Sequence, residues 1–331
     1  MGTVAVTGAT GFIGSAVVRH LLAAKRDVRA IIEPGANTKN LDDLNVERIT
    51  CDVTDAKRMQ KALSGCESLY HLAAIYRIWL EDPTPIWRVN VEGTSATLLA
   101  AKNAGVRRVV YTSSIAAIGL VEGGEADETC RFNLFDGNDY IMTKWLSERV
   151  ALSFADAGMS LVVVNPAFPF GPRDIAPTPT GKIILSILRG EFPAIPPGGI
   201  CTIDVDDCAM GHVLAEEKGR AGERYILGNE NVTLKELYAI VARIAGVKTP
   251  WLQVPASVAV SVALGMELWA DRVTHKEPSA TYRAARYAMK NVFFRCDKAK
   301  NELGMPTRPL AESVRRAVDW FREEGVIEAK S

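Results

Sequence analysis

Hydrophobic residues in the first half of the chain follow two alternating patterns. Short runs rich in valine and isoleucine are typical of strands, and apolar residues three and four positions apart are typical of helices. The expected strands cover 3–8, 27–32, 47–53, 68–74, 107–114 and 160–166, and the expected helices cover 15–25, 56–64, 85–104 and 140–157. Strands this uniformly apolar, separated by helices, indicate a parallel sheet with both faces covered. The sequence therefore predicts an α/β fold of the Rossmann type, with a doubly wound parallel sheet.

The composition of the sequence changes after residue 166. Proline and glycine become frequent in 165–182 and 192–200. The patterned segments that follow are a strand-like run at 223–228 and a helical run at 233–246. We expect a first domain over 1–166 and a smaller C-terminal lobe over 167–331, with crossover segments that let the two interleave. Because ligands of open α/β sheets bind at the carboxyl ends of the strands, we expect the smaller lobe to close over that edge as a lid.

The composition of the chain limits the classes of ligand that it is expected to bind. It has 331 residues, with 39 Lys and Arg against 39 Asp and Glu, so its formal net charge is zero. This balance gives no support for nucleic-acid binding, which needs a basic surface. Six scattered cysteines without a C-x-x-C pair predict reduced thiols, and the four histidines do not form a metal-binding pattern. The first residues lack the features of a signal peptide, so we expect a cytoplasmic protein.

The longest apolar stretch is "VPASVAVSVALGM" at 254–266. It is too short to cross a bilayer, which needs roughly 20 apolar residues. We therefore expect no transmembrane segment and interpret the stretch as a buried helix. The alternative is that it rests on a membrane, if the substrate is a lipid.

A glycine-rich loop, "TGATGFIG" at 7–14, joins the first strand to the first helix. Gly8 permits a tight turn, Gly11 lets the backbone approach a pyrophosphate, and Gly14 lets the helix pack closely on the strand. The helix N-terminus then faces the negative charge of the phosphates. A tight turn without a ligand is the alternative, but the position between strand and helix favours a dinucleotide site.

The ends of the next strands supply further cofactor contacts. Glu33 stands 19 residues after Gly14, where an acidic residue meets the ribose hydroxyls of NAD. An ordinary exposed glutamate is the alternative, in which case Lys39 or Arg29 reads the ribose and NADP is accepted. The other predicted cofactor-binding residues are Thr10, Phe12, Ile13, Asp52, Val53, Leu72, Ala73, Ala74, Thr112, Pro166 and Phe168, together with Tyr140 and Lys144.

Tyr140 stands four residues before Lys144, which places both side chains on one face of a helix. Taken alone, this spacing is typical of any amphipathic helix. Thr112-Ser113-Ser114, at the end of the preceding strand, puts hydroxyls at the same ligand-binding edge. A phenol there exchanges a proton with a substrate carbonyl or carbinol, and a neighbouring ammonium lowers its pKa and favours the phenolate.

Several motifs together give the chain a resemblance to the extended short-chain dehydrogenase/reductase superfamily over nearly its full length. They are "TGATGFIG", "HLAA" (71–74), "NVEGT" (90–94), "YTSSIAAIG" (111–119), "YIMTK" (140–144), "NPAFPFGP" (165–172) and "IDVDDCAMGHVLA" (203–215). Within the superfamily the chain is most similar to the dihydroflavonol-4-reductase branch. The segments "IYRIWLEDP" (75–83) and "GPRDIAPTPTGKII" (171–184) resemble the bacterial hopanoid-associated sugar epimerase group.

The resemblance implies a catalytic triad of Ser114, Tyr140 and Lys144, with Asn90 in the supporting proton network. Ser113 competes for the serine role, because adjacent serines are hard to separate by sequence. Plant dihydroflavonol reductases carry an arginine where this chain has Glu33, and that arginine meets the 2′-phosphate of NADP. The departure favours NAD here. In the superfamily the helices near 85–104 and 140–157 often pair across a dimer, but members of the dihydroflavonol-reductase branch are frequently monomers. The resemblance therefore implies a monomer or a homodimer.

The same triad serves reductases and sugar epimerases. An epimerase of nucleotide sugars keeps its NAD bound and needs cations for the diphosphate, for which Arg173 and Lys182 are available. The predicted substrate contacts are otherwise apolar, with core packing as the alternative for the aromatic ones; they are Ile75, Tyr76, Trp79, Phe168 and Phe170, beside Ser114 and Arg173. Bulky apolar side chains suit a hydrophobic small molecule. We therefore predict an NAD(P)-dependent oxidoreductase that interconverts a carbonyl and a secondary alcohol, ahead of an epimerase and of a non-catalytic dinucleotide sensor.

Overall fold

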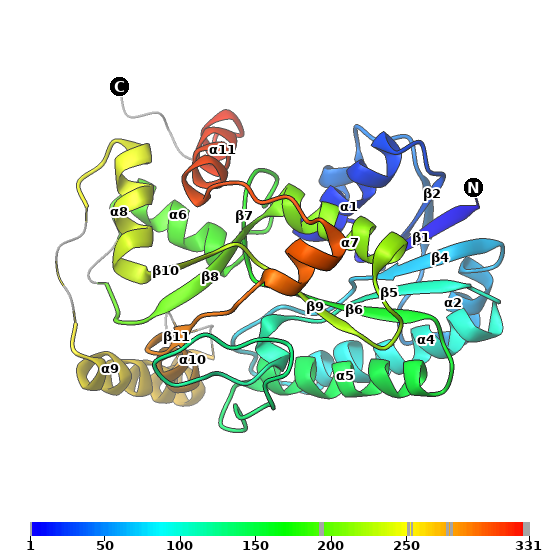
Figure 1. The fold of residues 1–331 in the computed structure, drawn as a ribbon. Coiled ribbons are helices and arrows are strands. Elements are labelled where there is room, and N and C mark those ends of the chain that lie inside the picture. Colours follow the sequence, from blue (N-terminus) through cyan, green and yellow to red (C-terminus); the bar gives the residue numbers. More distant parts are fainter. Residues whose placement is uncertain are drawn as a thin grey trace.

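Seven parallel strands form the central sheet of the computed structural model (Figure 1). The structure describes residues 2–191, 195–249, 252, 254–275, 278 and 281–326. In spatial order the strands are β3 (Glu47–Thr50), β2 (Val28–Ile32), β1 (Thr3–Thr7), β4 (Cys66–His71), β5 (Arg108–Thr112), β6 (Leu161–Pro166) and β9 (Arg224–Leu227). Their valine and isoleucine side chains are almost wholly buried, as the uniform apolar pattern predicts.

Helices cover both faces of this sheet, which confirms the doubly wound α/β prediction. One face carries α1 (Phe12–Ala23) and α7 (Val205–Lys218), and the other carries α2 (Ala56–Ala62), α4 (Gly93–Asn103) and α5 (Asp139–Asp156) (Figure 1). A short helix, α3 (Thr84–Trp87), and a π-helical turn (Arg88–Glu92) lead into α4. The six strands predicted before residue 167 all form, with ends that move by up to a few residues.

The second lobe is built on a smaller sheet. Its strands are β7 (Phe168–Phe170), β8 (Gly199–Asp204), β10 (Glu230–Thr233) and β11 (Asn291–Val292). The other three strands all pair with β8. Helices α6 (Pro179–Arg189), α8 (Leu234–Ala245) and α11 (Leu310–Glu323) share its core. Two more helices, α9 (Ala256–Trp269) and α10 (Tyr282–Ala288), pack against each other at its edge (Figure 1).

Two expectations for the second lobe are wrong in part. The run at 223–228, expected in the smaller lobe, becomes β9, which pairs with β6 in the large sheet. Helix α7 also packs against α1, so the chain crosses back to the first domain after residue 167, in line with the expected crossover segments. Strand pairing is non-local, and an isolated run cannot show which sheet it joins. The proline- and glycine-rich stretch 165–200, on which the expectation of a lid rests, is not a long loop. It contains α6, whose Ile184, Leu185 and Leu188 lie in the lobe's core; residues 192–194 lie outside the described residues.

Helix α9 is exposed, contrary to the prediction of a buried helix at 254–266. Among its described side chains only Ala263 is buried, while Val258 and Val262 are 50% and 51% exposed. The composition of this helix is apolar all round, and the sequence alone does not show which of its faces other elements cover. Within the residues that the structure describes, no helix is long and apolar enough to cross a membrane.

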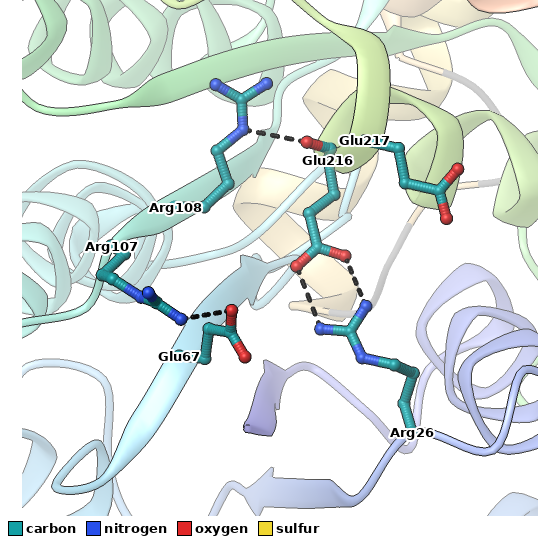
Figure 2. Close-up of a pocket in the computed structure, with 6 residues that line it drawn as sticks. All are labelled: Arg26, Glu67, Arg107, Arg108, Glu216 and Glu217. Atoms are coloured by element: carbon teal, nitrogen blue, oxygen red, sulfur yellow. Dashed lines mark hydrogen bonds and ion pairs between the residues drawn. The ribbon is translucent and has the colours of Figure 1, made fainter. Parts of the chain in front are cut away.

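A hollow of about 380 Å³ lies at the amino ends of the strands (Figure 2). Five of its six charged side chains, all but Glu217, take part in contacts within the hollow. Arg26 donates to both carboxylate oxygens of Glu216 at 3.1 and 3.3 Å, Arg107 pairs with Glu67, and Arg108 donates to the Glu216 carbonyl oxygen at 3.2 Å. These contacts anchor the end of α7 to the edge of the sheet, opposite the edge where the predicted site residues lie.

Candidate active site

The glycine loop forms a backbone cradle at the carboxyl end of β1. Gly8 has a φ of +66°, and a Cβ there would lie 2.8 Å from the Ala73 nitrogen. A Cβ on Gly14 would overlap the Gly8 carbonyl oxygen, so the helix packs on the loop only with glycine at this position. Gly11 begins α1 without a side-chain cap, which leaves its first N–H groups directed at the loop's open side. This geometry fits the pyrophosphate of a dinucleotide.

Glu33 follows β2 and is exposed at the carboxyl end of the strand. The Lys39 ammonium pairs with the Glu324 carboxylate of α11 at 2.5 Å. Arg29 donates to Glu47 and to the carbonyl oxygens of Ala62 and Ser64, near the amino ends of the strands. The interpretation that Arg29 reads the ribose is therefore wrong.

The remaining cofactor positions line the same edge of the sheet. Asp52 accepts hydrogen bonds from the Thr54 nitrogen at 2.8 Å and its hydroxyl at 2.7 Å, which lowers the pKa of its carboxyl group. Ala73 donates its N–H to the Thr7 hydroxyl oxygen at 3.3 Å. The other predicted residues at this edge lie partly or wholly buried in the glycine loop, in the first turn of α1 or at strand ends, and they are Thr10, Phe12, Ile13, Val53, Leu72, Pro166 and Phe168; Ala74 is exposed.

Ser114 and Tyr140 meet beyond the end of β5. Ser114 begins a 3₁₀ turn (Ile115–Ala117), and its hydroxyl lies near the phenol of Tyr140. Burial raises the pKa of Tyr140 to about 12, and the Ser114 hydroxyl acts in the opposite direction. The buried hydroxyl of Ser113 has no hydrogen-bond partner among the described residues. The geometry therefore favours Ser114 over Ser113 as the partner of Tyr140.

Lys144 lies one turn after Tyr140 on α5 and is only 4% exposed. Its ammonium donates to the Thr112 carbonyl oxygen at 2.8 Å and lies 5.4 Å from the Tyr111 ring centroid. Burial lowers the pKa of Lys144 to about 8, and the Glu148 carboxylate acts in the opposite direction. The expectation that Lys144 lowers the pKa of Tyr140 is not met here, because the burial of the phenol outweighs any such attraction.

Asn90 is buried in the π-helical turn before α4. Its side chain accepts from the Ile75 nitrogen at 2.7 Å and donates to the Ile75 carbonyl oxygen and the Thr143 hydroxyl, both at 3.1 Å. π-Helical turns frequently occur at functional sites. Here the amide fixes the segment after β4 against α5, one residue from Lys144.

A buried hydrogen-bond network, which the sequence did not predict, fixes the backbone of Ser114. The Asn165 amide donates to the Ser114 carbonyl oxygen at 2.9 Å and to the Glu148 carboxylate at 2.6 Å. Arg224 of β9 pairs with Glu148 at 3.0 Å. The sequence contained a signal for one member of this network, because Glu148 follows Lys144 by four residues and so lies on the same helix face.

A second buried contact fixes the strand that Lys144 touches. His212 of α7 lies 2.7 Å from the Cys208 carbonyl oxygen through Nδ1 and 3.0 Å from the Thr112 hydroxyl through Nε2. A carbonyl only accepts, so Nδ1 carries the proton and Nε2 accepts from Thr112. Burial lowers the pKa of His212 to about 4, so the ring is neutral.

Aromatic side chains from both lobes surround the phenol. The Tyr76 ring centroid lies 4.5 Å from that of Tyr140, and Tyr287 of α10 packs in the same apolar cluster. Ile75 and Trp79, in the same segment as Tyr76, are half-buried. Phe170 is 1% exposed within the core of the second lobe, so core packing, the alternative, describes its position. No spacing in the sequence links Tyr287 to Tyr140.

Arg173 lies beside the glycine loop, away from the aromatic cluster. Its carbonyl oxygen accepts from Asn40 at 3.1 Å, and Asn40 also donates to the Thr10 carbonyl oxygen at 3.2 Å. The Arg173 guanidinium lies 3.7 Å from Asp43. Its φ of +75° is rare for a residue other than glycine, and such strain often occurs at functional sites. The position suits the cofactor side of the cleft better than the predicted substrate side.

Comparisons with known proteins agree with this architecture. The model of the NAD dependent epimerase/dehydratase family matches residues 4–228. A putative dihydroflavonol 4-reductase of Synechocystis sp. is 36% identical, with 98% of this chain and 96% of that protein covered. Sterol demethylase protein B of Methylococcus capsulatus is 35% identical, with 98% and 100% covered. The crystal structure of gox2253 superimposes with a TM-score of 0.89 at 41% identity, with 98% and 99% covered.

The fold and these relatives define an NAD(P)-dependent enzyme of the short-chain dehydrogenase/reductase type. The chain belongs to the NAD dependent epimerase/dehydratase family, within the dihydroflavonol-4-reductase-like branch of the extended enzymes, which confirms the resemblance seen in its motifs.

Proposed function

We propose that this enzyme interconverts a ketone and a secondary alcohol on a bulky hydrophobic small molecule, with Tyr140 as the proton donor and acceptor. The observation that carries the proposal is the environment of the phenol. Tyr140 lies near the Ser114 hydroxyl, packs against the Tyr76 ring and shares an apolar cluster with Tyr287, so a polar reacting oxygen has apolar, aromatic neighbours. Neighbours of this kind bind an apolar molecule, and the hydroxyl groups fix its one polar group.

The residues have distinct roles in this proposal. A bound nicotinamide supplies or accepts the hydride. Ser114 holds the substrate oxygen next to the phenol. A pKa near 12 keeps Tyr140 protonated at neutral pH, ready to give its proton to the carbonyl oxygen during reduction. Lys144, held on the Thr112 carbonyl, carries a positive charge near the phenolate that forms.

Glu33 supports a preference for NAD over NADP. An exposed carboxylate at the end of β2 can accept hydrogen bonds from both ribose hydroxyls of NAD. A 2′-phosphate would bring nearly two negative charges against it. Lys39, the opposing cation, is paired with Glu324.

The second candidate function is epimerisation of a nucleotide sugar. The name of the family includes epimerases. Such a substrate needs cations for its diphosphate beside the reacting sugar. Arg173 is turned toward Asp43 and the glycine loop, and the residues that contact Tyr140 are aromatic. Both observations favour the reductase.

The test uses purified protein with NADH and a panel of aromatic and polycyclic ketones, beside UDP-glucose under the same conditions. The proposal expects oxidation of NADH with at least one apolar ketone, no sugar epimer, and no cofactor released when the purified protein is denatured. Tyr140→Phe protein is the control for background reduction. Epimerised sugar together with tightly retained NAD would establish the second candidate, and turnover of neither class would indicate a dinucleotide sensor.

A further inference from the structure

Exposed apolar side chains gather on one element of the molecule. Of the fourteen large hydrophobic residues that are exposed in the described chain, eight lie within 252–273. They are Leu252, Val258, Val262, Leu264, Met266, Leu268, Trp269 and Val273. Trp269 is 62% exposed, which is high for the largest apolar side chain. Contiguous exposure of this kind marks an interaction surface.

Charge is absent from the exposed half of α9. At 100° per residue, the remaining exposed positions on this side are Ser257, Ser261 and Gly265. Glu267, the one acidic residue of the helix, is turned to the inner side and accepts from the Tyr282 nitrogen at 2.7 Å. Half of the helix surface therefore offers no charge to water.

Cations lie next to this apolar surface. Helix α10 packs against α9, and its Arg283 and Arg286 are exposed, with Lys290 two residues beyond its end. Arg286 pairs with Asp136 at 3.1 Å, and Arg283 donates to the Gly137 carbonyl oxygen at 3.4 Å. All three cations line one hollow, so they lie on one side. Arg272, exposed, follows Trp269. The stretch 252–290 carries five Lys and Arg against three Asp and Glu.

The apolar surface adjoins the candidate active site. Helix α10 supplies Tyr287, which packs in the cluster with Tyr140. At the other end, His275 lies 3.2 Å from Glu81, in the segment that also carries Tyr76. The two aromatic neighbours of the phenol therefore come from the elements that border α9.

We propose that the exposed half of α9, with the cations of α10, docks on an anionic phospholipid bilayer, so that a hydrophobic substrate passes to Tyr140 from the membrane. A helix of 14 residues is about 21 Å long, too short to cross a hydrocarbon core of about 30 Å, so α9 lies in the interface. A tryptophan beside an arginine at one end is typical of interfacial helices. Pairing with a second copy through the same surface would bring the cations of both copies into one interface. The entry route rests on the proposed function; the docking does not.

Sedimentation of the full chain with vesicles tests the docking without any substrate. We expect binding to vesicles that contain phosphatidylglycerol, and roughly a tenfold or greater loss of partitioning for the double variant Val262→Glu, Trp269→Glu, which places two charges on the surface. Leu99→Glu on α4, a matched exposed site at 47%, should bind as the unmodified protein does. Unaltered NADH binding by all variants shows that they are folded.

Two results would overturn the proposal. One is equal vesicle binding by the unmodified protein and the double variant. The other is a dimer in solution that the double variant converts to a monomer, without vesicle binding, which would assign the surface to a second copy.

The contribution of charge has its own test. The double variant Arg283→Gln, Arg286→Gln should lose the preference for phosphatidylglycerol over phosphatidylcholine vesicles several-fold. Turnover of a water-soluble ketone without vesicle binding would remove the docking and leave the proposed function intact.

Discussion

The two ends of the parallel sheet carry polar groups in opposite ways. At the amino ends, Arg26 pairs with Glu216 and Arg107 with Glu67, and each arginine donates to a carboxylate. At the carboxyl ends, Lys144 is buried, and its ammonium meets the neutral carbonyl of Thr112 instead of a carboxylate. The pKa of Lys144 falls to about 8 and that of Tyr140 rises to about 12.

This difference separates groups that hold the fold from groups that are available for chemistry. Charges that are already paired with each other offer little to a further ligand, which is why the hollow at the amino ends does not mark a binding site. Buried groups with shifted pKa values, next to a backbone cradle, are the usual signature of a catalytic edge. Substitutions at the two ends should therefore have unlike effects.

Tyr140→Phe should have the largest effect on catalysis. Loss of a positioned acid–base group lowers turnover by about 10²–10⁴-fold. The affinity for NADH should change little, because the ring and its packing against Tyr76 remain. Steady-state kinetics with a reducible ketone, together with NADH titration, measure both. Near-normal turnover would remove Tyr140 from the mechanism.

Glu148→Gln should destabilise the protein much more than Glu67→Gln. Glu148 is 1% exposed and bonds both Arg224 and Asn165, so the amide leaves a partly buried arginine without its anion, at a cost of about 2–4 kcal/mol. Glu67 lies at the solvent-exposed amino end, and its replacement should leave the midpoint of urea unfolding unchanged. Similar midpoints for both variants would contradict the distinction between the two ends.

Glu33→Arg should move cofactor preference from NAD toward NADP by about tenfold or more, since ~1.4 kcal/mol is a factor of ten. The variant removes a carboxylate that repels the 2′-phosphate and adds a cation that binds it. The ratio of kcat/KM for NADH and NADPH is the measurement, with Lys39→Gln as the control. An unchanged ratio in Glu33→Arg would show that Glu33 does not face the ribose.

The pH profile should show the smallest but most specific effect. If the Lys144 ammonium is required, activity is present below its pKa and falls as the pH rises through about 8. The Glu148 carboxylate raises the pKa of Lys144, so Glu148→Gln should move this alkaline limb to lower pH. A limb that stays in place would show that another group controls it.

Local signals in the sequence were sufficient for the sheet, the glycine loop and the Tyr140–Lys144 pair. Each depends on residues a few positions apart, and spacing fixes their geometry. Tyr287 and Asn40 had no such signal, because the fold brings them to Tyr140 and Arg173 across more than 130 positions. Phe170 was misplaced for the same reason, since an aromatic residue after a strand suits a pocket and a core equally well.

The run at 223–228 and the helix at 254–266 were misjudged by a related cause. Composition identified a strand and an apolar helix, and both exist. It did not show which sheet the strand pairs with, or which face of the helix stays exposed, because both depend on tertiary contacts. The exposed apolar face of α9 is informative because it departs from the expected burial.

The most direct test of the account is to follow the hydride into the product. Unmodified protein is supplied with NADH deuterated at the transferred position and an apolar ketone, and the alcohol is analysed by mass spectrometry and NMR. The account predicts one deuterium on the carbinol carbon of each product molecule, and a yield of this alcohol that is about 10²–10⁴-fold lower with Tyr140→Phe protein. An alcohol formed without deuterium, or a sugar epimer formed with no exchange of deuterium from the added cofactor, would contradict it.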